Sequence, residues 1–277
     1  MLIMDTMSDA PTVPSMIIDA SCCLEYLVPV EIHAIFMLRP RSGSGQWIIR
    51  EEFDMNPRVP VEEYTDFYGN LCQRIAMPKG PFHYSMKCRA RVATELHSQP
   101  LAQLHSVRQL PVDVLHYLLP SRYCQSDKLG DLATSIVGNA PSSYQNVTSL
   151  RNWIHDNIAF QRGTSNSSTS ALETVTTRHG VCRDFAHLGI ALCRSINVPA
   201  RMVVGFVLGL DPMDLHAWFE AYISGQWFTF DATEDHPGGN RIVIAYGQDA
   251  ADVAIASIFG PFTCTTMKVT VALAPET

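Results

Sequence analysis

The stretch RHGVCRDFAHLGIALCRSINVPAR, residues 178–201, decides the fold because it places a cysteine at the start of an amphipathic helix. If the helix begins at Cys182, one face of it carries Phe185, Ala186, Gly189, Leu192, Cys193 and Ile196. Cys182 then faces inward at a helix N-terminus, where free N–H groups and the helix dipole stabilise a thiolate. Cys193 lies in the middle of the same helix and lacks this stabilisation.

Position alone leaves two interpretations of Cys182 open. It is either a nucleophile or a small buried residue, and burial is the commonest fate of a free cysteine. A base within reach of the thiol would favour the interpretation of Cys182 as a nucleophile.

The segment DLHAWFEAYISGQWFTFDATED, residues 214–235, supplies a candidate base. Ser224-Gly225 is a hairpin turn signal between two strand-like runs. A turn there pairs residues of the two strands whose numbers add up to 449, so that Trp218 faces Asp231. His216 and Asp231 are then diagonal neighbours on one face, about 7–8 Å apart at the backbone, within hydrogen-bonding reach of each other. A thiol, a histidine and a carboxylate supply the attacker, base and orienter of nucleophilic acyl transfer.

Three other histidines and one other carboxylate compete for these roles, but their positions are less favourable. His179 precedes the turn before the helix, and His187 lies well around the helix from Cys182. His236 lies in a predicted loop. The glutamate shares the face of His216 but lies nearer the hairpin turn than Asp231, so it ranks second as the orienting residue. These competitors are His179, His187, His236 and Glu220.

The overall composition excludes several classes of partner. A net charge of −7 without a cluster of Lys and Arg argues against nucleic acid and against an anionic membrane surface. The first residues contain no signal-peptide pattern, and no run of about 18 apolar residues occurs. We therefore expect a cytoplasmic protein, and the oligomeric state stays open.

The eight cysteines are expected to be reduced in that compartment. No C-x-x-C pair occurs, which argues against a structural zinc site. The adjacent Cys22 and Cys23 lie in a predicted strand and are interpreted as small apolar core residues. His33 and His83, in the same region, are interpreted as structural.

Two domains are predicted because the pattern of apolar residues changes from strand-like to helical along the chain. Short apolar runs separated by Pro, Gly or Asn indicate a β-sandwich-like domain over residues 1–95. A proline-containing linker follows over 96–112, and residues 113–277 form the second domain. That domain begins with helices near 127–138 and 147–159 and continues with a short helix near 171–180.

Three motifs resemble the transglutaminase-like superfamily, in its bacterial cysteine-protease-like branch. They are GVCRDFAHLGIALCRSINVPARMVVGF, HAWFEAYISGQWFTFDAT and RIVIAYGQDAADV, which together fall between about residues 112 and 260. The resemblance implies an α+β, papain-like core in which the cysteine helix packs on an antiparallel sheet. By the same resemblance, Cys182 is the nucleophile, His216 the general base and Asp231 the residue that orients the imidazole. The β region before residue 95 resembles the N-terminal region often attached to this branch.

The expected function is hydrolysis of a peptide or other amide through a thioester. Eukaryotic transglutaminases carry Gly-Gln-Cys-Trp where this chain has Gly-Val-Cys-Arg, which argues against protein cross-linking. Nothing resembles their calcium sites, so neither a metal nor another cofactor is predicted. Amine transfer and a catalytically silent binding module are the alternatives. The N–H of Cys182 is one candidate oxyanion donor, and Tyr123 and Trp153 are candidates for the second.

Overall fold

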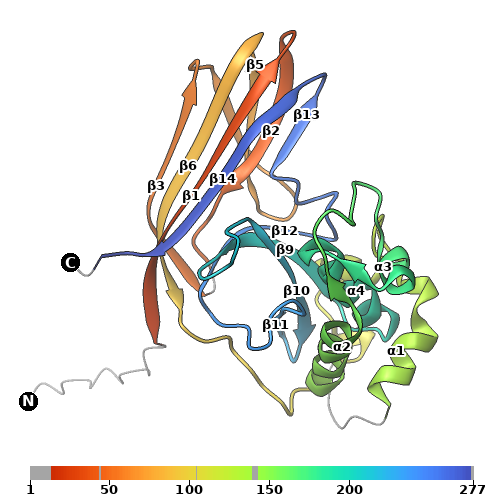
Figure 1. Cartoon of the computed structure of the whole chain (residues 1–277). Helices are drawn as coiled ribbons and strands as arrows, with labels where there is room; N and C mark the ends of the chain where they lie inside the picture. Colours follow the sequence, from red (N-terminus) through yellow and green to blue (C-terminus); the bar gives the residue numbers. More distant parts are fainter. Residues whose placement is uncertain (1–13, 44, 104, 139–142, 276–277) are drawn as a thin grey trace, which may run out of the picture.

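The computed structural model describes residues 14–43, 45–103, 105–138 and 143–275, so the first 13 residues lie outside the described part. Six strands of the N-terminal region contribute to two four-stranded sheets (Figure 1). Their bounds are β1 (Ser15–Val28), β2 (Ile32–Arg39), β3 (Gln46–Asn56), β4 (Val61–Thr65), β5 (Leu71–Met77) and β6 (Gly80–Ala93). The strand orders are β14-β1-β6-β3 and β13-β2-β5-β4.

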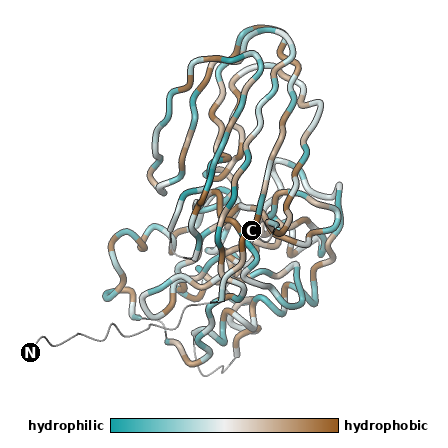
Figure 2. Tube along the Cα trace, turned by 90° about the vertical axis from the view of Figure 1, so that its left-hand side faces the viewer, coloured by the Kyte–Doolittle hydropathy of each residue, from teal (hydrophilic) through white to brown (hydrophobic). Residues whose placement is uncertain are grey.

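The alternation of apolar and polar residues explains why these strands form a two-layer domain. Every second side chain of β1 and β6 is buried, and hydropathy changes repeatedly along the strands (Figure 2). Phe36 of one sheet stacks on Tyr84 of the other, with ring centroids 4.4 Å apart. The two inner faces therefore form one core, as the β-sandwich prediction requires.

The chain returns to this sandwich at its C-terminal end (Figure 1). β13 (Ala256–Phe259) pairs with β2, and β14 (Thr263–Leu273) pairs with β1, both antiparallel. The sequence prediction had assigned these residues to the second domain. The difference arises because an alternating strand fits any compatible sheet edge, and its own residues do not specify which edge.

The second part of the chain contains an antiparallel sheet in the order β11-β10-β9-β12. Its strands are β9 (Ala200–Val207), β10 (His216–Ile223), β11 (Gln226–Phe230) and β12 (Arg241–Gly247). Four helices gather beside it in Figure 1, namely α1 (Gly130–Val137), α2 (Ser143–Asn157), α3 (Ala171–Thr177) and α4 (Cys182–Ser195). Short elements complete this part: η1 (Val107–Gln109), η2 (Val112–Leu118), η3 (Ser126–Lys128) and the paired β7 (Ala159–Phe160) and β8 (His179–Gly180).

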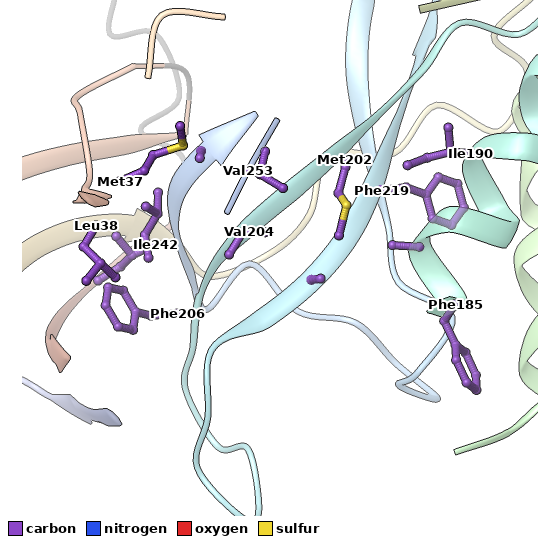
Figure 3. Packing of buried hydrophobic residues seen from close by; sticks show 14 of the residues in the cluster. Met37, Leu38, Phe185, Ile190, Met202, Val204, Phe206, Phe219, Ile242 and Val253 are labelled. Carbon is purple, nitrogen blue, oxygen red and sulfur yellow. The ribbon is translucent and has the colours of Figure 1, made fainter. Parts of the chain in front are cut away.

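Helix α4 packs closely on the sheet. Gly189 lies so near β10 that a Cβ atom there would overlap the ring of Phe219. Apolar side chains continue through β9 and β12 to Met37 and Leu38 of β2 (Figure 3). A single hydrophobic cluster thus joins the N-terminal sandwich to the helix that carries Cys182. This α+β arrangement, a cysteine helix on an antiparallel sheet behind a β-rich region, is the predicted fold.

Two carboxamide side chains of the N-terminal region bind the free edge of β12. The amide of Gln46 accepts from Val243 N–H at 2.7 Å and donates to Val243 C=O at 2.9 Å. Asn70 makes the same pair of contacts with Tyr246, at 2.8 and 2.7 Å. These side chains replace a neighbouring strand, so the edge backbone groups of β12 are hydrogen-bonded.

Among the residues that the structure describes, no helix is both long enough and apolar enough to span a membrane.

Candidate active site

Cys182 is the first residue of α4, at the position that the sequence predicted. Its neighbours hold the helix start in place: Asp184 accepts a hydrogen bond from Val181 N–H at 2.9 Å. Gly180 must lack a side chain, because a Cβ atom there would lie 2.8 Å from Cβ of Asp184. The first N–H groups of an α-helix have no partner inside the helix, so they can bind negative charge beside Cys182.

His216 opens β10 and is only 5% exposed. Its side chain forms a hydrogen bond with the Cys182 side chain, and Nε2 lies 2.8 Å from Oδ2 of Asp231. The hairpin below it has the predicted register, with Phe219 opposite Phe230 and Ile223 opposite Gln226. The structure therefore brings together the three residues that the sequence singled out.

Asp231 is buried and bound on both carboxylate oxygens. Oδ1 accepts from the N–H and the hydroxyl of Thr233, at 3.0 and 2.6 Å. Oδ2 accepts from Arg241 Nη1 at 2.7 Å, in addition to its contact with His216. Arg241 also donates to Glu234 at 2.9 Å. The carboxylate is thus held in one orientation, facing the imidazole.

The charges of this group reinforce one another. Burial by itself would lower the pKa of His216, but hydrogen bonds to Asp231 and Cys182 and the Asp231 charge raise that pKa to about 10. Burial would raise the pKa of Asp231, but its contacts with His216 and the charge of Arg241 hold that pKa well below its usual range. At neutral pH the site therefore contains an imidazolium between a carboxylate and the Cys182 sulfur.

Arg241, like Thr233, is a site residue that the sequence did not single out. It is 5% exposed and opens the otherwise apolar strand RIVIAYG, which is the one signal that pointed to it. His216, Asp231 and Glu234 offer three ligand atoms within 4.8 Å of one another. The Arg241 guanidinium forms ion pairs with both carboxylates and so supplies positive charge to this group.

Two of the competing residues, Glu220 and His187, have other partners. Glu220 forms an ion pair with Arg201, with N and O atoms 2.6 Å apart. His187 is buried, stacks on Tyr123, and accepts a hydrogen bond from Ala250 N–H at 3.1 Å. Burial lowers the pKa of His187 to about 3, so this ring is neutral. These contacts give both residues structural roles.

The two rings considered as second oxyanion donors also have partners elsewhere. The Tyr123 hydroxyl donates to Ser167 C=O at 2.7 Å. The Trp153 ring lies beneath the Arg178 guanidinium, 5.0 Å from its centre. The second donor stays a prediction.

The polar loop between β7 and α3 is tied to the first turn of α4. Ser165 donates to Asp184 at 2.9 Å, and Arg183 donates to the Ser165 hydroxyl and to Asn166 C=O, both at 2.6 Å. Arg183 directly follows Cys182 in the chain. The loop is therefore fixed next to the thiol, where it forms a rim of the site.

Two models of known protein families match this chain. The transglutaminase-like superfamily model matches residues 130–232, and the bacterial transglutaminase-like N-terminal region model matches residues 24–93. The first match includes Cys182, His216 and Asp231, and the second covers most of the β-sandwich. The two matched regions together account for both parts of the fold.

Individual proteins are similar to this chain over different shares of its length. A crystal structure of a candidate cysteine protease from Cytophaga hutchinsonii is 37% identical, covers 95% of this chain and 92% of its own, and has a TM-score of 0.88. An uncharacterized protein of Mycobacterium leprae is 24% identical over 78% of this chain and 82% of its own length. An uncharacterized protein of Mycobacterium tuberculosis is 31% identical over 38% of each chain. The chain therefore belongs to the transglutaminase-like superfamily and carries the bacterial N-terminal region of that family.

Proposed function

We propose that this protein is a thiol-dependent acyl-transfer enzyme that hydrolyses a peptide or another amide. The observation that carries the proposal is the 2.8 Å contact between His216 and Asp231, with the same imidazole bound to Cys182 at the start of α4. This chemistry requires a nucleophile, a base and an orienting carboxylate that contact one another in the folded protein.

In the proposed reaction, the Cys182 thiolate attacks the carbonyl carbon of the amide. The oxygen becomes negatively charged and is stabilised by the N–H of Cys182 at the helix start. Protonated His216 then donates its proton to the amine as the C–N bond breaks, which leaves a thioester on Cys182. Neutral His216 next removes a proton from water, and the hydroxide displaces the Cys182 thiolate from the thioester carbonyl. The carboxylic acid product leaves, and protonated His216 and the thiolate are restored.

Asp231, Thr233 and Arg241 act on this cycle through His216. The carboxylate binds Nε2, which leaves Nδ1 as the ring nitrogen that exchanges protons with the thiol and the leaving amine. Arg241 and Thr233 keep the carboxylate in place. His216 can therefore change its protonation state without rotating away from Cys182.

The test is a comparison of wild type with Cys182→Ala over a library of peptides and small amides, with products weighed by mass spectrometry. Cys264→Ser, at an exposed position, is the control for loss of a thiol. We expect hydrolysis by wild type and by Cys264→Ser, and none by Cys182→Ala. Addition of free primary amines separates hydrolysis from amine transfer, because transfer gives a product heavier by the added amine. Substrate binding with equal and negligible turnover in all three proteins would instead identify a binding module.

A further inference from the structure

A second cluster of reactive side chains lies on the N-terminal sandwich, outside the candidate active site. Cys23 and Glu25 come from β1, and His83 comes from β6. Glu25 is directly opposite His83 in the ladder, and Cys23, two residues earlier in β1, faces the same side. The Cys23 sulfur lies 3.7 Å from Nδ1 of His83, and the same nitrogen lies 4.0 Å from a Glu25 oxygen.

The burial of β1 shows that this cluster is not part of the core. Cys22 is fully buried between the sheets, whereas Cys23 is half-buried on the opposite face. The interpretation of both cysteines as apolar core residues is therefore correct for Cys22 only. Glu25 is exposed and His83 half-buried, so solvent and ions can reach all three side chains.

The carboxylate of Glu25 is oriented but not neutralised. One of its oxygens accepts a hydrogen bond from the hydroxyl of Thr266 on β14, at 2.8 Å. Within the described part of the chain, Glu25 forms no ion pair with a lysine or an arginine. This differs from the cluster around Asp231, where the Arg241 guanidinium supplies the positive charge.

We propose that Cys23, Glu25 and His83 form a binding site for Zn²⁺. One ligand atom from each residue lies within 4.8 Å of the other two. Zinc bonds of about 2.3 Å to sulfur and about 2.0–2.1 Å to nitrogen, at tetrahedral angles, place those two atoms about 3.6 Å apart. The sulfur and Nδ1, 3.7 Å apart, already meet that spacing, and the exposed Glu25 side chain must move closer to both atoms to complete three ligands.

The ligand set favours zinc over harder or softer ions. A thiolate, an imidazole and a carboxylate together match the borderline character of Zn²⁺, whereas Mg²⁺ and Ca²⁺ prefer oxygen ligands alone. Thr266 acts on the site through its hydrogen bond to the Glu25 carboxylate. The residues His83 and Cys23 are 60 positions apart, so spacing rules based on C-x-x-C did not detect the site.

Binding releases the thiol proton of Cys23 to solvent, because the thiolate is the form that coordinates metal. Burial and the Glu25 charge raise the pKa of Cys23, although the charge of Lys268, opposite Cys23 on β14, acts against them. Affinity should therefore increase with pH. Three protein ligands leave a fourth tetrahedral position open. Glu25 and His83 also line a hollow of about 500 Å³, through which a water or a small ligand can reach that position.

The experiment uses Co²⁺ as a spectroscopic probe of the zinc site in the full chain without a polyhistidine tag. The parent protein carries Cys182→Ser, so that the thiol of the candidate active site cannot contribute. We expect Co²⁺ to produce a thiolate-to-cobalt charge-transfer band that Zn²⁺ removes by displacement. Cys23→Ser should abolish the band, and His83→Ala should weaken Co²⁺ binding by about 10-fold or more.

Two further groups of variants make the result specific. Thr266→Val should weaken binding by about 10-fold, since it removes the hydrogen bond to Glu25 without removing a ligand. Cys264→Ser and His33→Ala, at exposed positions of the same sandwich, should leave the titration unchanged. The proposal is overturned if no charge-transfer band forms, if the band persists in Cys23→Ser, or if Cys264→Ser removes it. None of these outcomes depends on the proposed amide hydrolysis.

Discussion

Asp231 accepts four hydrogen bonds, from His216, from Arg241 and from two groups of Thr233. Asp231→Asn keeps the shape but removes the charge that raises the pKa of His216. We expect this variant to fold and to lose up to about 10⁴-fold in kcat. His216→Ala should be more severe and remove nearly all turnover, because it removes the base itself.

The pH dependence of the rate shows whether Asp231→Asn acts through the His216 imidazole or by disturbing the fold. His216 in Asp231→Asn should lose its proton at lower pH than in wild type, so the alkaline limb of the rate profile should shift down. Steady-state rates between about pH 6 and about pH 10 measure this shift. A wild-type rate in Asp231→Asn would eliminate Asp231 as the orienting residue and make Glu234 or Glu220 the candidate.

Cys182 should react with iodoacetamide far faster than the other cysteines near pH 6. An ordinary thiol, with a pKa of about 8.5, is less than about 1% thiolate there. The helix start and the imidazolium of His216, whose pKa is about 10, both place positive charge beside the Cys182 sulfur. His216→Ala should therefore slow the labelling.

Peptide mapping by mass spectrometry reads this reaction at each cysteine. Cys264 is the matched control because it is exposed but has neither a helix start nor an adjacent imidazolium. Cys193 is buried, and burial raises its pKa, so it should not label in the folded protein. Equal labelling of Cys182 and Cys264 would support the interpretation of Cys182 as a structural residue.

The buried neutral ring of His187 should make the fold sensitive to acid. Its pKa is about 3 in the folded protein but about 6.5 in an unfolded chain. The unfolded state therefore binds a proton first, and stability falls as the pH drops from about 6.5 towards about 3. At about pH 4.5 this group alone should cost about 2–3 kcal/mol.

Urea unfolding of wild type and His187→Gln at about pH 7 and about pH 4.5 isolates this contribution. Gln can still accept the hydrogen bond from Ala250 but does not titrate. The stability that His216 gains from its raised pKa is fully present below about pH 6.5 and is lost as the pH rises through about 10. Both proteins carry His216, so this contribution cancels in their comparison. An identical acid dependence in the two proteins would contradict the prediction.

The contact between α4 and β10 depends on Gly189. Alanine in a helix interior is normally more stable than glycine by about 1 kcal/mol. Here the added Cβ would overlap the Phe219 ring, and overpacking costs about 1–3 kcal/mol. We expect Gly189→Ala to be destabilising by up to about 2 kcal/mol, measured by urea unfolding. Gly130→Ala, at the open start of α1, is the control and should be neutral or stabilising.

The N-terminal sandwich and the sheet β11-β10-β9-β12 should unfold as one unit because Gln46 and Asn70 bind the edge of β12. Either side chain replaced by alanine leaves one N–H and one C=O of that strand without a protein partner. We expect each substitution to cost about 1–3 kcal/mol and the two costs to be roughly additive. Gln99→Ala, at an exposed position, should change the free energy of unfolding very little.

A calorimetric scan checks the coupling of the two parts directly. Wild type should give one transition, since one hydrophobic cluster spans both parts. In the double variant Gln46→Ala, Asn70→Ala, the midpoint of this transition should be lower, or the single transition should separate into two. A midpoint equal to that of wild type would mean that the apolar contacts between the parts are sufficient.

Several features of this protein follow from local sequence patterns. The start of α4 at Cys182 is predicted by helical spacing and by the glycine before it. The pairing of His216 and Asp231 follows from a short turn at Ser224-Gly225, which determines the register of a hairpin. Alternation in β1 and β6 predicts a two-layer sandwich. Each of these depends on residues close together in the chain, where geometry leaves few alternatives.

Only the tertiary structure decided which distant segments meet. The strand pattern of β14 is compatible with many sheet edges, and its pairing with β1 depends on how the whole chain closes. The partners of Arg241, Gln46 and Asn70, and the approach of Cys23 to His83, likewise join segments far apart in sequence. Local periodicity determines which face of an element is apolar, but the partner of a polar side chain is chosen by long-range packing, which no short stretch of sequence encodes.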